Sequence, residues 1–424
     1  MSLDIKSNYR GIKWACYITN VSMAAVCSIS PLLFTTFNEI YEISYTQLGL
    51  LTVFLFSVQL LFDIIFTFFS KYFNVRAVII ATPLLTVAGL LIYAFMPKAF
   101  PSHTYLWLVI GTLIFASSAG LTEVLASPII ASIPSKNPES EMSKLHSSYA
   151  WGLVGVVILG SALLYAVGKE NWMVLPLVFS SLPILAFFLY LFSPFPKVNT
   201  GSEEVGKSRT RVFSFGLLLC TVCIFLGGAS ECTMTNWISG YMEKALGIEK
   251  IIGDIFGMAL FALALSIGRT LYAKYGKNIC RVMLLGMISA GACYLVAGLS
   301  GVGAIGVCAS VLCGFCVSML WPGTIILLGE KFPTAGVAAY ALMAAGGDCG
   351  ASVTPEIMGI IADEFALTPL GAYLAERFSM DSEQIGMRAG MVISAAFPIL
   401  GFLLLLYMKK YFAKPQKNPM DSID

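Results

Sequence analysis

The sequence predicts an all-α membrane protein with twelve transmembrane helices in two six-helix bundles. Of its 424 residues, 58% are hydrophobic and 12% are charged, whereas a soluble domain is typically about 25% charged and about 45–50% apolar. A transmembrane helix needs about 20 mainly apolar residues, so the apolar residues suffice for about twelve such helices. The 26 basic and 24 acidic residues nearly cancel, which excludes a strongly charged surface for nucleic acid.

Apolar runs bounded by charged residues, Pro or Gly mark the expected helices in order. In the first half of the chain they cover residues 14–37, 48–69, 77–97, 105–132, 147–168 and 173–193. In the second half they cover residues 213–242, 252–273, 280–299, 303–328, 336–362 and 387–408. The chain is polar between the sixth and seventh runs, so we expect an N-terminal bundle (1–195), a cytoplasmic linker (196–212) and a C-terminal bundle (213–424).

The distribution of basic residues predicts that both termini lie in the cytoplasm. With that orientation, 20 of the 26 Lys and Arg residues fall in inner segments. The other six fall outside, and they are Lys98, Lys169, Lys244, Lys250, Arg377 and Arg388. Cytoplasmic loops are enriched in basic residues, which supports this orientation. We expect an integral protein of the cell (cytoplasmic or inner) membrane.

The two halves carry Gly and Pro at matching positions. Gly120 and Pro128 lie eight residues apart in the fourth run, and Gly314 and Pro322 lie eight apart in the tenth. A Gly-x-x-Gly pair begins 24 residues after the first proline and 25 after the second. Small residues at such spacings let helices approach closely. Their repetition predicts two parallel six-helix repeats.

Five acidic residues, Asp63, Glu123, Glu231, Asp348 and Glu356, fall well within the predicted spans, and Asp254 falls near the outer end of the eighth. An ionisable side chain inside a bilayer is costly unless it faces a cavity or a partner, so each of them marks a candidate site. We take Glu123, Glu231 and Asp348 as the candidate cation-coupling residues.

Glu123 has small, mildly polar neighbours on its own helix face, Ala119 and Ser127. Desolvation at such a position favours the neutral carboxyl group, as proton carriage requires. The structural alternative is a buried hydrogen bond that holds two helices together.

Glu231 follows Gly227 and Gly228 near the middle of the seventh run, and Asn236 and Trp237 follow it. An amide and a carboxylate can bond the hydroxyl groups of a solute, while an indole can stack on a sugar ring. The alternative for this group is helix packing.

Asp348 and Glu356 are eight residues apart, so they share one helix face with Ser352 and Pro355. Two acids on one stripe are typical of a helix that lines a water-filled cavity. Asp348 lies near mid-depth, whereas Glu356 lies nearer the outer end, where water can solvate it.

The remaining polar and aromatic candidates lie beside these acids in the predicted spans. Asp63 follows Gln59 by one turn and is either a cavity group or the partner of a basic residue at a cytoplasmic gate. His146 opens the fifth run and is either a surface residue or a gating group. The candidate solute-binding residues are Asn20, Gln59, Glu123, Tyr149, Trp151, Glu231, Asn236, Trp237, Trp321 and Asp348.

The chain resembles the major facilitator superfamily, and within it the fucose-permease-like branch of sugar:proton symporters. The similar stretches are residues 122–129, 146–149, 231–237, 318–323 and 346–350. The resemblance implies alternating access by rocking of the two halves, with the solute bound near the midplane. It also implies proton-driven uptake, with Glu123 at the position of the branch's fourth-span acid.

The same resemblance implies gating residues on the cytoplasmic side. Gly268 and Arg269 resemble the second-half copy of the superfamily's gating motif, and residues 71–76 resemble the first-half copy. The first copy has Lys71 where the superfamily usually has Asp. Separately, the first span lacks the carboxylate that the fucose permease carries, and this absence counts against fucose as the solute. The candidate gating residues are Asp63, Lys71, Arg76, His146 and Arg269.

We therefore expect a monomeric symporter for a small hydroxylated solute, a sugar or a sugar-like molecule, with a proton or sodium as coupling ion. The alternatives are a proton-coupled exporter of amphipathic or cationic compounds, and a solute sensor or structural partner that transports nothing. An enzyme is not expected, because the sequence has no P-loop, nucleophile elbow or metal constellation. We expect no cofactor, no metal and no obligate protein partner. The expected surroundings are the lipid bilayer. The eleven cysteines are expected to act as small hydrophobic residues.

Overall fold

The computed structural model describes residues 9–43, 45–198, 214–248 and 257–413, and this part of the chain contains helices and no strand. The first bundle consists of α1 (Arg10–Tyr41), α2 (Tyr45–Phe69), α3 (Val75–Ala99), α4 (Thr104–Ala131), α5 (Pro138–Val167), α6 (Val174–Phe179) and α7 (Ser181–Phe192). The second consists of α8 (Phe215–Leu246), α10 (Leu260–Tyr275), α11 (Ile279–Leu299), α12 (Gly303–Val317), α13 (Leu320–Lys331), α14 (Val337–Glu364), α15 (Pro369–Phe378), α16 (Ser382–Ser394) and α17 (Ala396–Ala413). Most of the predicted linker lies outside the described residues.

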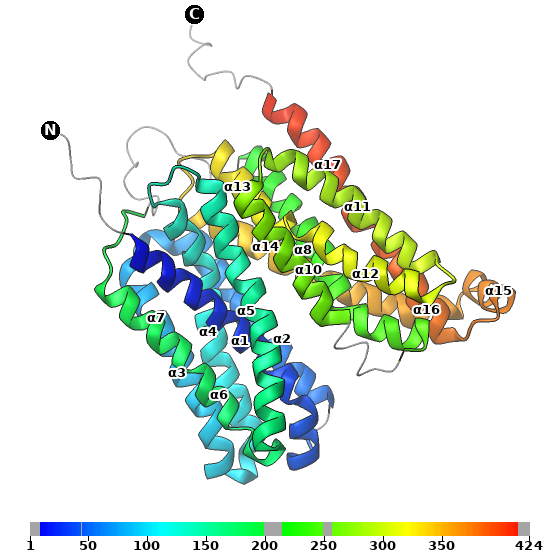
Figure 1. The fold of residues 1–424 in the computed structure, drawn as a ribbon, viewed down its shortest axis with the longest axis horizontal. Helices are drawn as coiled ribbons and strands as arrows, with labels where there is room; N and C mark the ends of the chain where they lie inside the picture. Colours follow the sequence, from blue (N-terminus) through cyan, green and yellow to red (C-terminus); the bar gives the residue numbers. More distant parts are fainter. Residues whose placement is uncertain (1–8, 44, 199–213, 249–256, 414–424) are drawn as a thin grey trace, which may run out of the picture.

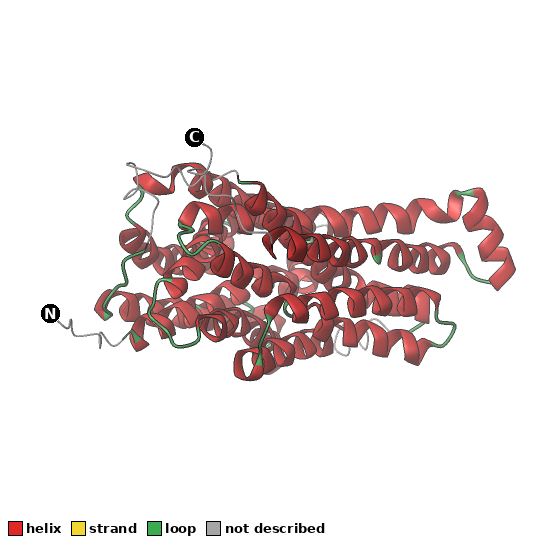
Figure 2. Ribbon diagram, turned by 90° about the horizontal axis from the view of Figure 1, so that it is seen from above, coloured by secondary structure: helices red, strands yellow, loops and turns green. Residues whose placement is uncertain are grey.

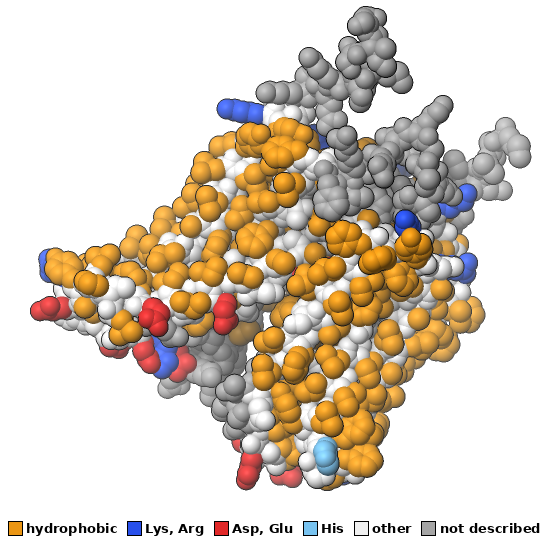
Figure 3. All heavy atoms as spheres, turned by 180° about the vertical axis from the view of Figure 1, so that it is seen from behind, with side chains coloured by type: hydrophobic (Ala, Val, Ile, Leu, Met, Phe, Trp, Pro, Cys, Tyr) orange, Lys and Arg blue, Asp and Glu red, His pale blue; other side chains and the backbone are white. Residues whose placement is uncertain are grey.

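The two bundles form the arms of a V (Figure 1). They meet at the end where α1 begins and α17 ends, which we call the apex, and they diverge toward the opposite ends, which we call the tips. Figure 2 shows the same helices from above, with every long element helical. In Figure 3, hydrophobic side chains cover the outside of both arms, while basic side chains lie mainly near the apex and acidic ones near the tips.

Ten described helical segments are long and apolar enough to cross a membrane, or eleven if the bent pair formed by residues 337–367 and α15 is one span. The remaining predicted span, the eighth, corresponds to α10, which is described for 16 residues after the undescribed stretch 249–256. Each of the twelve predicted apolar runs thus coincides with a described helix or pair of helices.

The tenth predicted span is divided into α12 and α13 just before Pro322, although prolines inside α1, α3, α4 and α14 leave those helices continuous. A proline lacks the N–H that would bond the carbonyl four residues earlier, so Pro322 leaves the Ser318 carbonyl group free of its helical partner. The helix is interrupted by a turn at Ser318 and Met319. The freed carbonyl oxygen has a partner in the site described below.

The start of one predicted helix is wrong, and one short helix was not predicted. The fifth helix begins at Pro138 instead of residue 147, because Asn137 caps it by accepting a hydrogen bond from the Ser140 N–H at 3.0 Å and Pro138 suits its first turn. The polar residues of this extension hide it from a hydropathy reading. The short amphipathic helix α15, which Thr368 caps, was not predicted either.

The repeated glycines serve close contacts at equivalent places in the two bundles. A methyl group on Gly120 of α4 would lie 3.0 Å from the Cα of Gln59 in α2. A methyl group on Gly314 of α12 would lie 2.5 Å from the carbonyl oxygen of Phe261, the second residue of α10. The second and fourth spans of each half therefore touch backbone to backbone, as a parallel repeat requires.

Candidate functional site

Several of the polar side chains predicted inside the membrane converge where the two bundles meet. Helix α5 of the first bundle packs against α10 of the second, and α2 packs against α14, with α4 also touching α14. Any relative rocking of the bundles must change these contacts.

Arg269 of α10 is at the centre of one side of this interface, and it is 4% exposed. Its Nη2 donates to both carboxylate oxygens of Glu231 in α8, at 2.9 and 3.0 Å. Its Nε donates to the Ser318 carbonyl oxygen at 3.0 Å, the group that Pro322 leaves free. Its Nη1 donates to the carbonyl oxygen of His146 in α5 at 3.2 Å, so one guanidinium group links both bundles.

Further hydrogen bonds join α5 to α10, and we call this set of contacts the α5–α10 seam. Ser143 Oγ donates to the carbonyl oxygen of Arg269 at 2.8 Å, and Ser140 Oγ donates to that of Ala273 at 2.5 Å. At the two ends of the seam, Tyr272 donates to Glu139 at 2.6 Å and Trp151 Nε1 donates to Thr270 at 2.9 Å. The residues come mostly from the polar start of α5, which positions them opposite the second bundle.

A cluster of three acids occupies the other side of the interface. Asp63 of α2 is fully buried, Asp348 of α14 is 4% exposed, and Glu123 of α4 is half-buried. The groups that act electrostatically on Asp63 are Asp348, Glu123 and Cys349, and Glu123 in turn is influenced by Asp348. The described acids, thiols and imidazoles form no group of three or more that could hold a metal ion.

The structure does not fit one of the two roles considered for Asp63, or one of the two considered for His146. Asp63 has an acid, Asp348, as its neighbour across the interface and not a basic gate partner. His146 is not a plain surface residue, because its Nε2 is buried, without a hydrogen-bond partner among the described residues, and the ring lies within electrostatic reach of Arg269.

Several candidate solute-binding residues use their polar groups inside the protein. Asn20 donates to the Leu145 carbonyl oxygen at 2.9 Å, Gln59 donates to the Cys27 Sγ at 3.8 Å, and Trp237 donates to the Pro355 carbonyl oxygen at 2.8 Å. Trp321 packs over Gly228 and Gly347, where added methyl groups would meet its ring. These contacts hold α1 to α5, α2 to α1, and α8 to α14.

The other candidates lie in more open positions. Tyr149 is half-buried and lies near Cys27 and Glu123, while Trp151 is 44% exposed and Asn236 is exposed. Tyr149 and Glu123 from one bundle are thus brought near Asp348 from the other.

Three residues considered above lie apart from this interface. Lys71 and Arg76 are exposed at the turn between α2 and α3, where the Lys71 Nζ lies 4.9 Å from the centre of the Tyr72 ring. Glu356 is exposed on α14.

Sequence reasoning missed the contribution of Ser140, Ser143 and Ser318. Two signals in the chain point to them: the i, i+3 spacing of serines after a helix-capping Asn137, and a proline four residues after Ser318. Neither signal names its partner, because Arg269 lies more than 120 residues from Ser143 in sequence.

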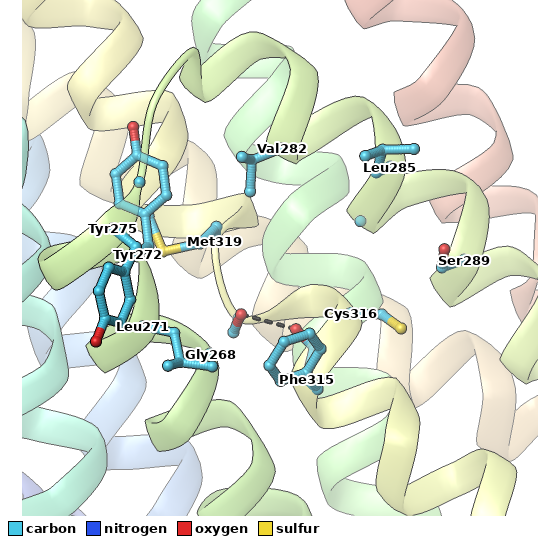
Figure 4. A pocket seen from close by; sticks show the side chains of 13 residues that line it. Gly268, Leu271, Tyr272, Tyr275, Val282, Leu285, Ser289, Phe315, Cys316 and Met319 are labelled. Atoms are coloured by element: carbon cyan, nitrogen blue, oxygen red, sulfur yellow. Dashed lines mark hydrogen bonds between the residues drawn. The ribbon is translucent and has the colours of Figure 1, made fainter.

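A separate cavity of about 350 Å³ lies between α10, α11 and α12 (Figure 4). Its walls are mainly apolar, with Leu271, Val282, Leu285 and Phe315 among them. The hydroxyl group of Ser318 at its edge already donates to the Phe315 carbonyl oxygen at 2.7 Å. Its composition therefore does not suit a hydroxylated solute.

Residues 15–355 match the model of the Major Facilitator Superfamily. The chain belongs to the major facilitator superfamily. Its sequence is also 19% identical over 244 residues to a TsgA homologue from Buchnera aphidicola, a match that covers 58% of this chain and 60% of that protein, less than two thirds of its length.

Solved major facilitator structures share the fold at low sequence identity. The fucose:proton symporter FucP of E. coli matches with a TM-score of 0.71 and 16% identity over 94% of this chain and 98% of its own. FucP in the outward conformation matches with a TM-score of 0.73 over the same shares. The proton:xylose symporter XylE matches with a TM-score of 0.74 and 14% identity over 96% of this chain and 97% of its own. The chain is thus a membrane transporter by family, and not an enzyme.

Proposed function

We propose that this protein imports a small hydroxylated solute, a sugar or sugar-like molecule, together with a proton. The observation that carries the proposal is that Glu123 of α4 and Asp348 of α14 lie within electrostatic reach of one another where these two helices of opposite bundles touch. Glu231 already has a positive partner in Arg269. Glu123 has an acid facing it instead, so a bound cation would change its interaction with the opposite bundle.

The arrangement of the arms supports an outward-facing state. The bundles meet at the apex, where α1 begins and α17 ends, and the excess of basic residues in the predicted inner loops assigns that end to the cytoplasm. A solute entering between the tips would reach Glu123 and Tyr149, and Trp151 at one end of the α5–α10 seam, before the rest of the seam. Rocking of the arms would then open the apex and close the tips.

Glu123 is the proposed coupling acid. Glu123→Gln keeps the size and hydrogen-bonding capacity of the side chain but cannot take up or release a proton. In proteoliposomes we expect this variant to exchange labelled solute across the membrane while losing accumulation against a gradient. Glu356→Gln, which alters an exposed acid outside the cluster, serves as the matched control and should accumulate solute normally.

The solute can be identified in the same preparation with a pH-sensitive dye. Hexoses, deoxyhexoses, amino sugars, polyols and organic cations are added singly, and external alkalinisation on adding one sugar supports symport. Proton movement in the opposite sense, seen only with organic cations, would favour the exporter. Uptake that follows a sodium gradient and is indifferent to pH would replace the proton by sodium.

A further inference from the structure

We propose that Asp63 and Asp348 form a single shared-proton site that ties the two bundles together where α2 packs against α14. The ligand is one proton, and the site is distinct from Glu123. Its place in the transport cycle rests on the proposed function, but the binding of the proton does not.

The geometry brings two buried carboxyl groups from opposite bundles together. Asp63 is fully buried on α2 and Asp348 is 4% exposed on α14, and these helices pack against each other. The two side chains lie within hydrogen-bonding reach of one another. With both groups ionised, Oδ1 and Oδ2 of Asp63 and Oδ2 of Asp348 have no hydrogen-bond partner among the described residues.

A shared proton resolves this arrangement. A carboxylate can only accept hydrogen bonds, so two ionised groups would repel and leave buried oxygens unsatisfied. One proton supplies the missing donor and gives an O–H···O⁻ bond, which belongs to the strong, charge-assisted class. The pair then carries one negative charge instead of two.

The surrounding ionisable groups do not supply an alternative positive charge. Those that interact with the pair are Glu123 from α4, Cys349 from α14, Cys27 from α1 and Cys232 from α8, all acids or thiols. Arg269 is engaged with Glu231 on the other side of the interface. No described basic side chain thus neutralises this pair of carboxyl groups, and a proton shared between them would do so.

Separation of the bundles must release that proton. Once α2 and α14 move apart, each aspartate meets water alone and loses the partner that held the proton, which passes to that water. By linkage, the ratio of open to closed apex should rise by up to about tenfold for each pH unit over the range in which one proton is released. Acidic pH thus favours the closed apex and alkaline pH favours the open one.

The test uses the purified full-length protein in lipid nanodiscs without solute. Infrared difference spectra report the C=O band of a protonated carboxyl group, and hydrogen–deuterium exchange of peptides from residues 138–146 and 269–276 reports opening of the apex. In the wild type we expect the band to disappear, and exchange in these peptides to accelerate, over the same pH range.

Asn variants separate a shared proton from simple packing. In Asp63→Asn the amide donates permanently to Asp348, so the part of the acid band that belongs to this pair should be lost and the exchange of the apex peptides should become independent of pH. Asp348→Asn should behave alike from the other bundle, which keeps the test valid if one variant folds poorly. Glu356→Gln, on the same helix as Asp348, should retain the wild-type response.

The outcomes distinguish this inference from the proposed function. A pH response that survives in both Asn variants but vanishes in Glu123→Gln would overturn the shared-proton site and leave symport intact. A pH response that vanishes in the Asn variants, in a protein that couples no solute to protons, would support the site while the proposed symport fails.

Discussion

Arg269 is a residue whose role depends on the shape of its side chain as well as on its charge. Its planar fork reaches a carboxylate in α8, a carbonyl oxygen freed by Pro322 and a carbonyl oxygen of α5. Three segments therefore depend on one side chain, and two of them lie in the same bundle. We infer that Arg269 keeps Glu231 neutralised throughout and exchanges its bond to α5 as the bundles rock.

The shape requirement predicts different effects for two substitutions. Arg269→Lys keeps the charge beside Glu231 but cannot reach all three acceptors, and each lost bond to a charged group is worth about 1.5–3 kcal/mol. Arg269→Gln leaves Glu231 uncompensated, which typically costs about 3–5 kcal/mol for a buried pair. Thermal unfolding in detergent should rank wild type above Arg269→Lys and that above Arg269→Gln.

A second substitution checks the cause of this loss. Glu231→Gln added to Arg269→Gln removes the uncompensated charge, so part of the lost thermal stability should return. Equal unfolding temperatures for Arg269→Gln and the wild type would show that the pair does not contribute to folding.

At the scale of elements, the start of α5 closes the apex. Ser140 and Ser143 donate across the α5–α10 seam, and each neutral hydrogen bond contributes about 0.5–1.5 kcal/mol. Changing both to Ala should shift the closed–open equilibrium by about 1–3 kcal/mol, roughly 5- to 150-fold. Hydrogen exchange of the apex peptides measures the shift.

Ser117→Ala supplies the control for that experiment. Ser117 is also a helical serine, but it donates to the Leu113 carbonyl oxygen of its own helix. Faster exchange at the apex in this variant, to the same degree as in the double variant, would remove the seam as the cause.

The repeat glycines provide a matched pair of substitutions in α14 and α5. A methyl group on Gly350 would meet the backbone of Phe225, with its carbonyl carbon 2.9 Å away, whereas one on Gly155 would meet nothing within 4 Å. Because backbone atoms cannot turn aside, Gly350→Ala should destabilise by about 1–3 kcal/mol. Gly155→Ala should be neutral or stabilising by about 0.5–1 kcal/mol, from helix propensity. Thermal unfolding of the two variants tests both, and equal effects would contradict the assigned contact.

At the scale of the whole molecule, the proposed topology places the two ends of α3 on opposite sides of the membrane. Lys71 precedes α3 and Lys98 lies in its last turn, and both are exposed. With cytoplasmic termini, a membrane-impermeant amine reagent applied to intact cells should modify Lys98 and spare Lys71 until the membrane is permeabilised. Peptide mass spectrometry reads both sites, and the reverse pattern would invert the proposed topology.

Composition and hydropathy predicted the fold because a bilayer imposes a length and an apolarity on every spanning helix. Each apolar run coincides with a helix or a pair of helices, and Gly120 and Gly314 make equivalent close contacts, whereas Gly155 and Gly350 do not. The predicted start of α5 was wrong because hydropathy registers only apolar residues. Its polar residues are stabilised by the opposite bundle, which a local reading of hydropathy does not register.

The sequence by itself determined that the chain is a helical membrane transporter of repeated halves and which acids lie within the spans. Only the tertiary structure decided their partners: Arg269 for Glu231, the freed Ser318 carbonyl oxygen for Arg269, and Asp348 for Asp63. The reason is that burial of an ionisable group depends on residues near in space, and here those residues come from distant helices and from opposite bundles.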